Sequence, residues 1–295
     1  MKAKTYDRIA TAVFYTVALS VMLLLFLIVG YILYKGLRTI NLNFITSSPK
    51  FMETGGGVAP QLYNSFCLLV LSMVITIPLG VGAGIYMAEY AKPGKITNFI
   101  RLCIETLSSL PSIVIGLFGF LIFVNRMKLG FSLLSGAMAV TVLNLPSMTR
   151  LSEDAIRGVD PSIKEASLAL GASKWETIYK VIIPSAMPGL ITGTIISAGR
   201  VFGEAAALLY TGGMTTPELR FDILNPLVRN SPLSPLRPAE TLSVYIWKVN
   251  SEALAPDARQ IADGASALLL IVVFLFNFFA RYLGRIFHRH HEGSK

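Results

Sequence analysis

Charge is scarce in this sequence, and so are the side chains that usually build catalytic and redox sites. Only 15% of the 295 residues are charged, whereas 53% are hydrophobic and the mean hydropathy is +0.61. A soluble domain carries about 25% charged residues. All three histidines lie in the C-terminal tail, where a natural basic tail explains them as well as metal binding does. The composition therefore predicts an integral membrane protein, and we assign no metal site.

Two further absences narrow the possible functions. The sequence has only two cysteines, Cys67 and Cys103, which we expect at opposite membrane depths, about 30 Å apart and too far for a disulfide. It has no Gly-x4-Gly-Lys-Ser/Thr phosphate loop, so the chain needs no cofactor and any ATP must be bound by a partner subunit. The net charge of +9 is explained by cytoplasmic loops and anionic lipid headgroups rather than by nucleic acid.

Long apolar segments dominate what remains, and they predict an all-α integral membrane protein with six transmembrane helices. The predicted spans are 10–33, 62–87, 102–124, 129–145, 184–209 and 262–283. Six spans place both termini on one side, and the inner segments hold more Lys and Arg when that side is the cytoplasm. We therefore expect a multi-pass protein of a plasma (inner) membrane with both termini cytoplasmic. The predicted parts are an N-terminal span with its outer loop (1–61), a core (62–284, with an outer segment 210–261) and a basic tail (285–295).

A polar insert, 147–183, interrupts the apolar segments and carries the local signals of two short helices. Asp160 can cap the first helix, and Pro161 suits its first position, where no amide hydrogen bond is needed. Gly171 can end that helix in a left-handed conformation. Ser173 and Glu176 have the spacing of a capping box that begins the second helix.

The second helix of the insert has one apolar face, because Trp175, Ile178 and Ile182 recur at helical spacing. A membrane protein has little reason to expose Trp and Ile on a loop unless a partner covers them. The pattern therefore predicts a docking element. The alternative is an ordinary amphipathic loop that packs against its own protein.

The fifth predicted span contains two charged residues, Arg200 and Glu204. A charge at membrane depth costs several kcal/mol unless it is paired or hydrated, so it indicates function. The two residues are four apart, which places them on one helical face where they can pair. We expect Arg200 to line a passage and meet an anion, with Glu204 fixing the Arg200 side chain and limiting how tightly the anion is held. The alternative is a buried pair that only ties helices together.

The insert also carries a family pattern. Glu165-Ala166-Ser167 is followed by Gly171 and then by Val181-Ile182-Ile183-Pro184. This resembles the EAA loop of ABC importer permeases, with mild departures at three positions. The resemblance implies the type I importer permease fold and cytoplasmic coupling helices that sit in a groove of an ATPase. The residues that it assigns to ATPase coupling are Glu165, Ala166, Gly171, Trp175 and Pro184.

Three more blocks, 84–91, 111–119 and 200–206, are similar to permeases of phosphate-specific ABC importers, and their order is closest to the A-type (PstA) subunits. That resemblance implies import of inorganic phosphate through a passage lined by Arg200, Glu204 and Arg150. Arg150 matches a family arginine at the inner mouth, where a headgroup contact is equally compatible. The implied partners are a homologous second permease (PstC-type), two ATPase subunits (PstB-type) and an external phosphate-binding protein (PstS-type), in a prokaryotic membrane.

Three rival functions remain open at this point. The first is an importer permease for another oxyanion or small solute, which the coupling loop alone does not exclude. The second is a membrane-embedded enzyme that uses Glu89, Glu105 or Glu204, which the lack of a His/Asp/Glu cluster at membrane depth disfavours. The third is a structural scaffold, which would not need an intramembrane Arg and Glu.

Overall fold

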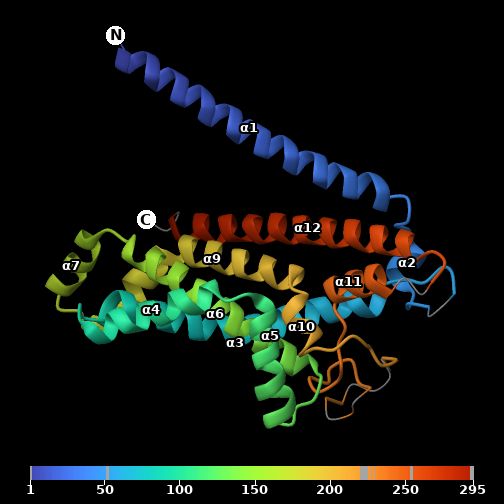
Figure 1. Ribbon diagram of the computed structural model, residues 1–295. Helices are drawn as coiled ribbons and strands as arrows, with labels where there is room; N and C mark the ends of the chain where they lie inside the picture. Colours follow the sequence, from blue (N-terminus) through green and yellow to red (C-terminus); the bar gives the residue numbers. More distant parts are fainter. Residues whose placement is uncertain are drawn as a thin grey trace.

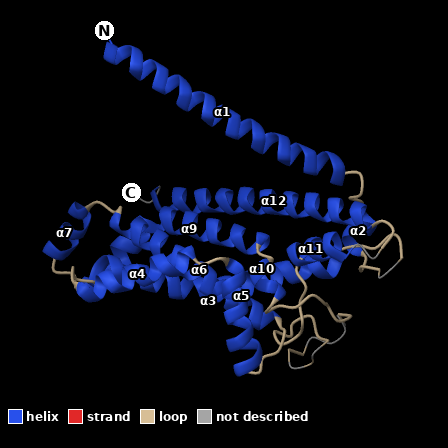
Figure 2. Cartoon of the chain, in the orientation of Figure 1, coloured by secondary structure: helices blue, strands red, loops and turns tan. Residues whose placement is uncertain are grey.

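The computed structural model is helical throughout its described part, with no strand among those residues (Figure 2). The described residues are 2–50, 53–219, 225–226, 228, 230–252 and 255–292. In chain order the elements are α1 (Lys2–Gly36), α2 (Leu42–Thr46), α3 (Ala59–Ile85), the π-helical segment η1 (Tyr86–Tyr90), α4 (Lys95–Ser109), α5 (Ser112–Gly119), the π-helical segment η2 (Phe120–Arg126), α6 (Leu133–Arg157), α7 (Pro161–Ala169), α8 (Lys174–Thr177), the π-helical segment η3 (Ile178–Ile182), α9 (Ile183–Gly203), α10 (Ala206–Leu209), α11 (Leu242–Glu252) and α12 (Ala258–Glu292).

Four helical stretches are long and apolar enough to cross a membrane: Tyr6–Gly36, Ala59–Tyr90, Lys174–Gly203 and Ala258–Tyr282. They agree with the first, second and sixth predicted spans, and with the fifth as far as Gly203, where α9 ends instead of continuing to Leu209. Figure 1 shows α3, α6, α9 and α12 running together as a bundle. α1 joins this bundle only at its C-terminal end and then diverges, so that none of its apolar stretch is buried.

The third predicted span is wrong as a continuous helix. α4 and the α5–η2 helix are bent by 100° at the break between them, and α5 turns away from the bundle (Figure 1). Pro111 explains the break, because proline lacks an N–H and disfavours the α conformation in the preceding residue. Leu110 accordingly has ψ of 136°.

The fourth predicted span was expected to end at Pro146, but the helix does not end there. α6 continues through Pro146 to Arg157, because Pro146 is buried in the bundle and the surrounding packing holds the helix together despite the missing amide. The first part of the polar insert, 147–157, is therefore the C-terminal end of α6, and the bounds of the insert stay a prediction. α6 is not among the four stretches that pass as membrane spans, so six spans are not confirmed.

α3 and α6 pack backbone to backbone at glycines. A Cβ on Gly80 would lie 2.5 Å from Cγ of Met148, and a Cβ on Gly84 would lie 2.5 Å from Cβ of Ser152 and 2.9 Å from the amide nitrogen of Glu153. Separations below about 3 Å require atoms to move, and here one of them is backbone. The pair α3 and α6 therefore forms a closely packed unit that small residues make possible.

This packing predicts a difference between two glycines that are two residues apart and so lie on different faces of α3. We expect Gly84→Ala to destabilise the protein by about 1–3 kcal/mol through overpacking, and to lower the Tm in detergent by several degrees. Gly82→Ala is the matched control, since a Cβ there meets nothing within 4 Å. Equal Tm values for the two variants would contradict the close packing of α3 on α6.

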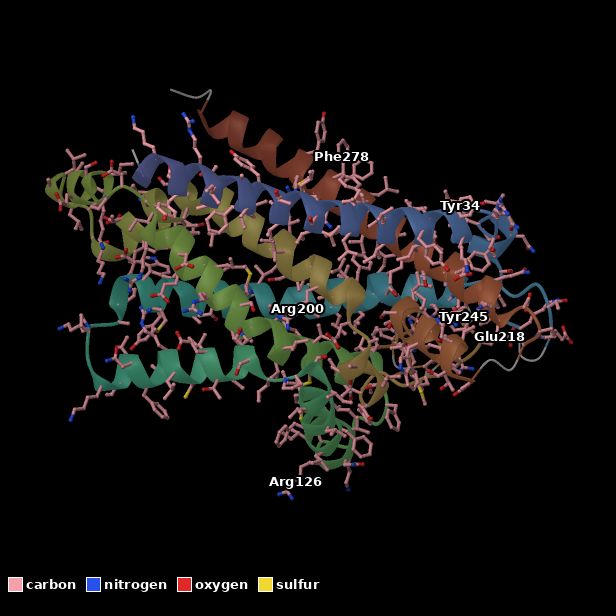
Figure 3. The ribbon with its side chains drawn as sticks, turned by 45° about the horizontal axis from the view of Figure 1, so that its top comes forward. Tyr34, Arg126, Arg200, Glu218, Tyr245 and Phe278 are labelled. Carbon is pink, nitrogen blue, oxygen red and sulfur yellow. The ribbon has the colours of Figure 1, made fainter. Side chains whose placement is uncertain are left out.

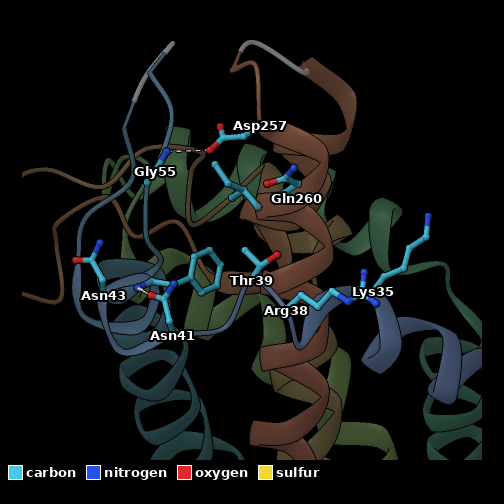
Figure 4. A pocket seen from close by; sticks show the side chains of 11 residues that line it. Lys35, Arg38, Thr39, Asn41, Asn43, Gly55, Asp257 and Gln260 are labelled. Atoms are coloured by element: carbon cyan, nitrogen blue, oxygen red, sulfur yellow. Dashed lines mark hydrogen bonds between the residues drawn. The ribbon is translucent and has the colours of Figure 1, made fainter.

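The end of the bundle opposite α7 is polar. Gly36 of α1 packs against the backbone of Asp263 in α12, and a cavity of about 470 Å³ opens beside this crossing (Figure 4). Lys35, Arg38 and Gln260 are among its lining residues. Asp257 Oδ2 accepts a 2.8 Å hydrogen bond from the Gly55 amide, which ties the loop after α2 to the start of α12.

Side chains of the basic tail fall outside the described residues from 285 onward, as do all atoms of residues 293–295. The backbone of α12 runs as far as Glu292. The proposed part boundaries at 61, 62 and 284 stay predictions.

Candidate functional site

The two short helices α7 and α8 and the turn between them, residues 161–177, form what we call the coupling element. Their ends follow the sequence signals. Asp160 accepts a 2.9 Å hydrogen bond from the Ser162 amide, and this bond lowers the pKa of Asp160 below its usual value. Gly171 has φ of +86°, and Ser173 and Glu176 form the capping box. The predicted local structure of the insert is confirmed.

The predicted apolar face of the second helix is only partly exposed. Ile178 and Ile182 are each 1% exposed and pack in a cluster with Ile156 of α6, so their predicted exposure is wrong. Trp175 is 61% exposed and stacks on Tyr179, with 6.3 Å between ring centroids. The helix continues from α8 through η3 into α9, and this continuation turns the isoleucines toward α6 while the aromatic pair faces outward.

The outer surface of the coupling element is open to a partner. Leu170 is 89% exposed at the turn, and Glu165 and Ala166 are exposed on α7. Glu165 makes no hydrogen bond or ion pair within the described part of the chain. An apolar surface of this kind beside a free carboxylate is typical of an interaction site rather than of a folded interior.

The coupling element is joined to a membrane span without an intervening loop. Lys174–Gly203 is one continuous apolar helix, and Pro184 is the second residue of α9. Proline cannot donate the hydrogen bond of a regular helix. The preceding turn, η3, has the wider π-helical hydrogen bonding: the Ile183 amide donates to Ile178 O, five residues back. A displacement of α8 therefore passes directly into α9.

The predicted pairing of Arg200 with Glu204 is wrong. α9 ends at Gly203, and Glu204 has an extended conformation with ψ of 125°, so the two residues do not share a helical face. The Glu204 carboxylate accepts a 3.0 Å hydrogen bond from the Ala207 amide at the start of α10, and its carbonyl oxygen accepts one from Ser243 Oγ. Glu204 thus fixes the backbone break after α9 instead of holding Arg200.

Arg200 lies on the exposed face of α9, on the same stripe as Thr192 and Ile196, and Figure 3 places it near the middle of the molecule. It makes no hydrogen bond or ion pair with the described residues. The other face of α9 packs on α6, where a Cβ on Gly189 would lie 2.6 Å from Ala155 and one on Gly193 would lie 3.1 Å from Leu151. Arg200 is consequently a free cation aimed away from its own bundle.

The carboxylates that an enzyme would use are each occupied by a separate partner. Glu105 forms a 3.0 Å ion pair with Arg150, both side chains being more than half exposed. Glu89 forms an ion pair with Lys164 on α7. With Glu204 bonded to an amide, these three carboxylates form no common cluster, and the described residues hold no group of His, Cys, Asp and Glu that fits a metal.

Sequence reasoning missed a buried polar network between the outer segment and α3. Arg237 is 0% exposed and donates a 2.7 Å hydrogen bond to Asn64 Oδ1. Glu240, 3% exposed, accepts from Gln61 and pairs with Lys248, and burial raises its pKa. Periodicity does not reveal such a network because its members come from segments far apart in the sequence. The network anchors the outer segment onto α3.

Comparison with known proteins identifies the arrangement. The family model described as "Binding-protein-dependent transport system inner membrane component" matches residues 80–292. The chain belongs to this family. It is 52% identical over 289 residues to the probable ABC transporter permease protein YqgI of Bacillus subtilis, covering 98% of both chains. It is 34% identical over 283 residues to the probable permease YqgH of the same organism, covering 93% of this chain and 85% of that one.

A phosphate transport system permease protein PstA from Yersinia pestis is 32% identical over 252 residues, covering 84% of this chain and 80% of the relative. Among solved structures, a bacterial alginate ABC transporter in complex with its periplasmic protein contains a chain with a TM-score of 0.64 and 16% identity. The alignment covers 94% of this chain and 95% of that one. The likeness to this solved structure supports the permease fold. The family membership supports the role as a membrane component of a transport system.

The chain is therefore an ABC importer permease subunit of a multi-pass inner-membrane type. In this family the permease forms the membrane component and a separate subunit hydrolyses ATP. A permease of this kind works with another permease, an ATPase and a binding protein.

Proposed function

We propose that this chain is the A-type permease subunit of an ATP-driven importer of inorganic phosphate. Arg200 carries the proposal, because it is an exposed cation without a partner among the described residues, on a helix that otherwise crosses the membrane as apolar sequence. A guanidinium binds phosphate oxygens through charge-assisted hydrogen bonds. The relationship to a PstA protein across 84% of the chain supports the same substrate.

The mechanism that we propose is alternating access. Closure of the ATPase subunits displaces the coupling element, and the continuous helix Lys174–Gly203 carries that displacement to Arg200. The tilt of α9 then changes which side of the membrane the Arg200 face meets. Glu204 holds the backbone break after α9 through the Ala207 amide, so α9 moves without unfolding the outer segment.

The proposed partners follow from the surfaces that one chain leaves open. The Arg200 face of α9 requires a second permease across the passage, and we assign a homologous PstC-type subunit to it. YqgI and YqgH support such a pair, because one organism holds two permeases that both resemble this chain. Two PstB-type ATPases would grip the coupling elements, and a PstS-type binding protein would deliver phosphate at the opposite end. This arrangement places the coupling element and both termini in the cytoplasm.

The test is ATP hydrolysis by the assembled complex in proteoliposomes. With its binding protein present, we expect inorganic phosphate to stimulate hydrolysis by about tenfold, within the range of coupling between linked sites. Sulfate at the same concentration is the matched control for the anion. Stimulation by sulfate alone would replace phosphate with another oxyanion, and phosphate uptake without any ATPase subunit would overturn the proposed role.

A further inference from the structure

The π-helical segment η1, which continues α3, contacts both helices of the coupling element. The Glu89 carboxylate forms an ion pair with Lys164 of α7. Lys174 of α8 donates a 2.6 Å hydrogen bond to the Glu89 carbonyl oxygen, and its ammonium lies 4.2 Å from the centroid of the Tyr90 ring. A single turn of chain, η1, is thus held by one lysine from each helix of the coupling element.

Hydrogen bonds tie together the elements on each side of this contact. Within the coupling element, the Ser167 and Thr177 hydroxyls are 3.0 Å apart and link α7 to α8. On the other side, Arg157 of α6 donates to Met87 O in η1 at 3.2 Å and pairs with Glu153 at 2.9 Å. Together with the glycine packing of α3 on α6, these bonds make η1 the outward edge of the α3–α6 unit.

Burial makes the Glu89 contact resistant to separation. The Glu89 side chain is 8% exposed and that of Lys164 is 36% exposed. Withdrawing Lys164 would leave the buried Glu89 carboxylate without its counter-charge, which is unfavourable. The pair is therefore expected to stay closed when the coupling element moves, so that Glu89 and Lys164 travel together.

We propose that Glu89 is a positioning residue that transmits movement of the coupling element to the α3–α6 unit. This route runs beside the covalent route through Pro184 into α9, and it rests on the proposed function. Glu165 and Lys164 are neighbours on α7, with Glu165 facing a partner and Lys164 facing Glu89. A force applied at the partner-facing side of α7 then reaches both α9 and the α3–α6 unit.

The experiment measures phosphate transported per ATP hydrolysed in proteoliposomes of the full complex. We expect Glu89→Gln and Lys164→Gln each to lower this ratio by about tenfold, within the range of coupling energies between linked sites. The ATPase subunits should still copurify with both variants. Lys180→Gln is the matched control, since Lys180 is 68% exposed and its ion-pair partner is Glu176, on its own helix rather than on α3; its ratio should equal the wild-type value.

The charge-swapped double variant Glu89→Lys with Lys164→Glu separates transmission from simple packing. We expect it to recover the ratio to within about threefold of wild type, because the ion pair is restored with its polarity reversed. If Glu89→Gln fails to assemble, Lys164→Gln decides, since its side chain is partly exposed. An unchanged ratio in Lys164→Gln, or no recovery in an assembled swap, overturns this inference alone. A wild-type complex that lacks phosphate-stimulated hydrolysis overturns the proposed function instead.

Discussion

Replacing Arg200 by Gln is expected to lower phosphate uptake by about 100-fold while leaving the complex assembled. The exposed guanidinium has no partner among the described residues, so its removal leaves no orphaned carboxylate and should not disturb the fold. Loss of a hydrogen bond to a charged group costs about 1.5–3 kcal/mol, and the expected change in rate corresponds to the upper part of that range, about 2.7 kcal/mol. Uptake of labelled phosphate into proteoliposomes measures the effect, and copurification of the ATPase measures assembly.

Two controls make the Arg200 result specific. Arg200→Lys keeps the charge but loses the bidentate geometry, so it should retain part of the uptake. Thr192→Ala lies on the same exposed stripe of α9 without a charge and should transport normally. Wild-type uptake by Arg200→Gln would remove Arg200 from the mechanism and leave the passage to other residues.

Reversing the charge of Glu165 is expected to uncouple ATP hydrolysis from transport. Glu165 is exposed on α7 and makes no hydrogen bond or ion pair within the described chain, so Glu165→Lys should leave this subunit folded and change only the surface that the ATPase meets. We expect phosphate stimulation of hydrolysis to fall by about tenfold or more, because linked sites commonly couple by 5- to 150-fold.

The control for Glu165 is a charge reversal at the same end of the bundle but outside the coupling element. Asp154 of α6 is exposed, and Asp154→Lys should retain phosphate stimulation of hydrolysis. Both variants are compared in the same proteoliposomes at low ionic strength, where surface electrostatic effects are largest. Unaltered stimulation in Glu165→Lys would count heavily against contact between α7 and the ATPase.

Local signals could be predicted from the sequence where they depend on a few neighbouring residues. The Asp160 cap, the left-handed Gly171 and the Ser173 capping box all appear where the sequence indicates them. The four helical stretches that are long and apolar enough to cross a membrane were also predicted in large part, because length and hydropathy can be read from the sequence alone. The helix ends of the coupling element follow from the first kind of signal, whereas its continuity with α9 was seen only in the structure.

The errors came from features that depend on packing between distant segments. Hydropathy alone does not show that the chain bends by 100° at Pro111 but continues as a helix through Pro146, because the difference lies in what surrounds each proline. Similarly, the four-residue spacing of Arg200 and Glu204 assumed an unbroken helix. The break at Gly203 depends on the Ala207 amide and on Ser243, both outside that window.

The π-helical turn η3 has a consequence for the rotational alignment of the molecule. An α-helix advances about 100° per residue, so the one extra residue in such a turn sets the angle between everything before it and everything after it. Deleting one residue within Ile178–Ile182 would rotate the Trp175 side of the coupling element by about 100° relative to Arg200. The number of residues in this short turn therefore fixes the direction in which a movement of α8 displaces the Arg200 end of α9.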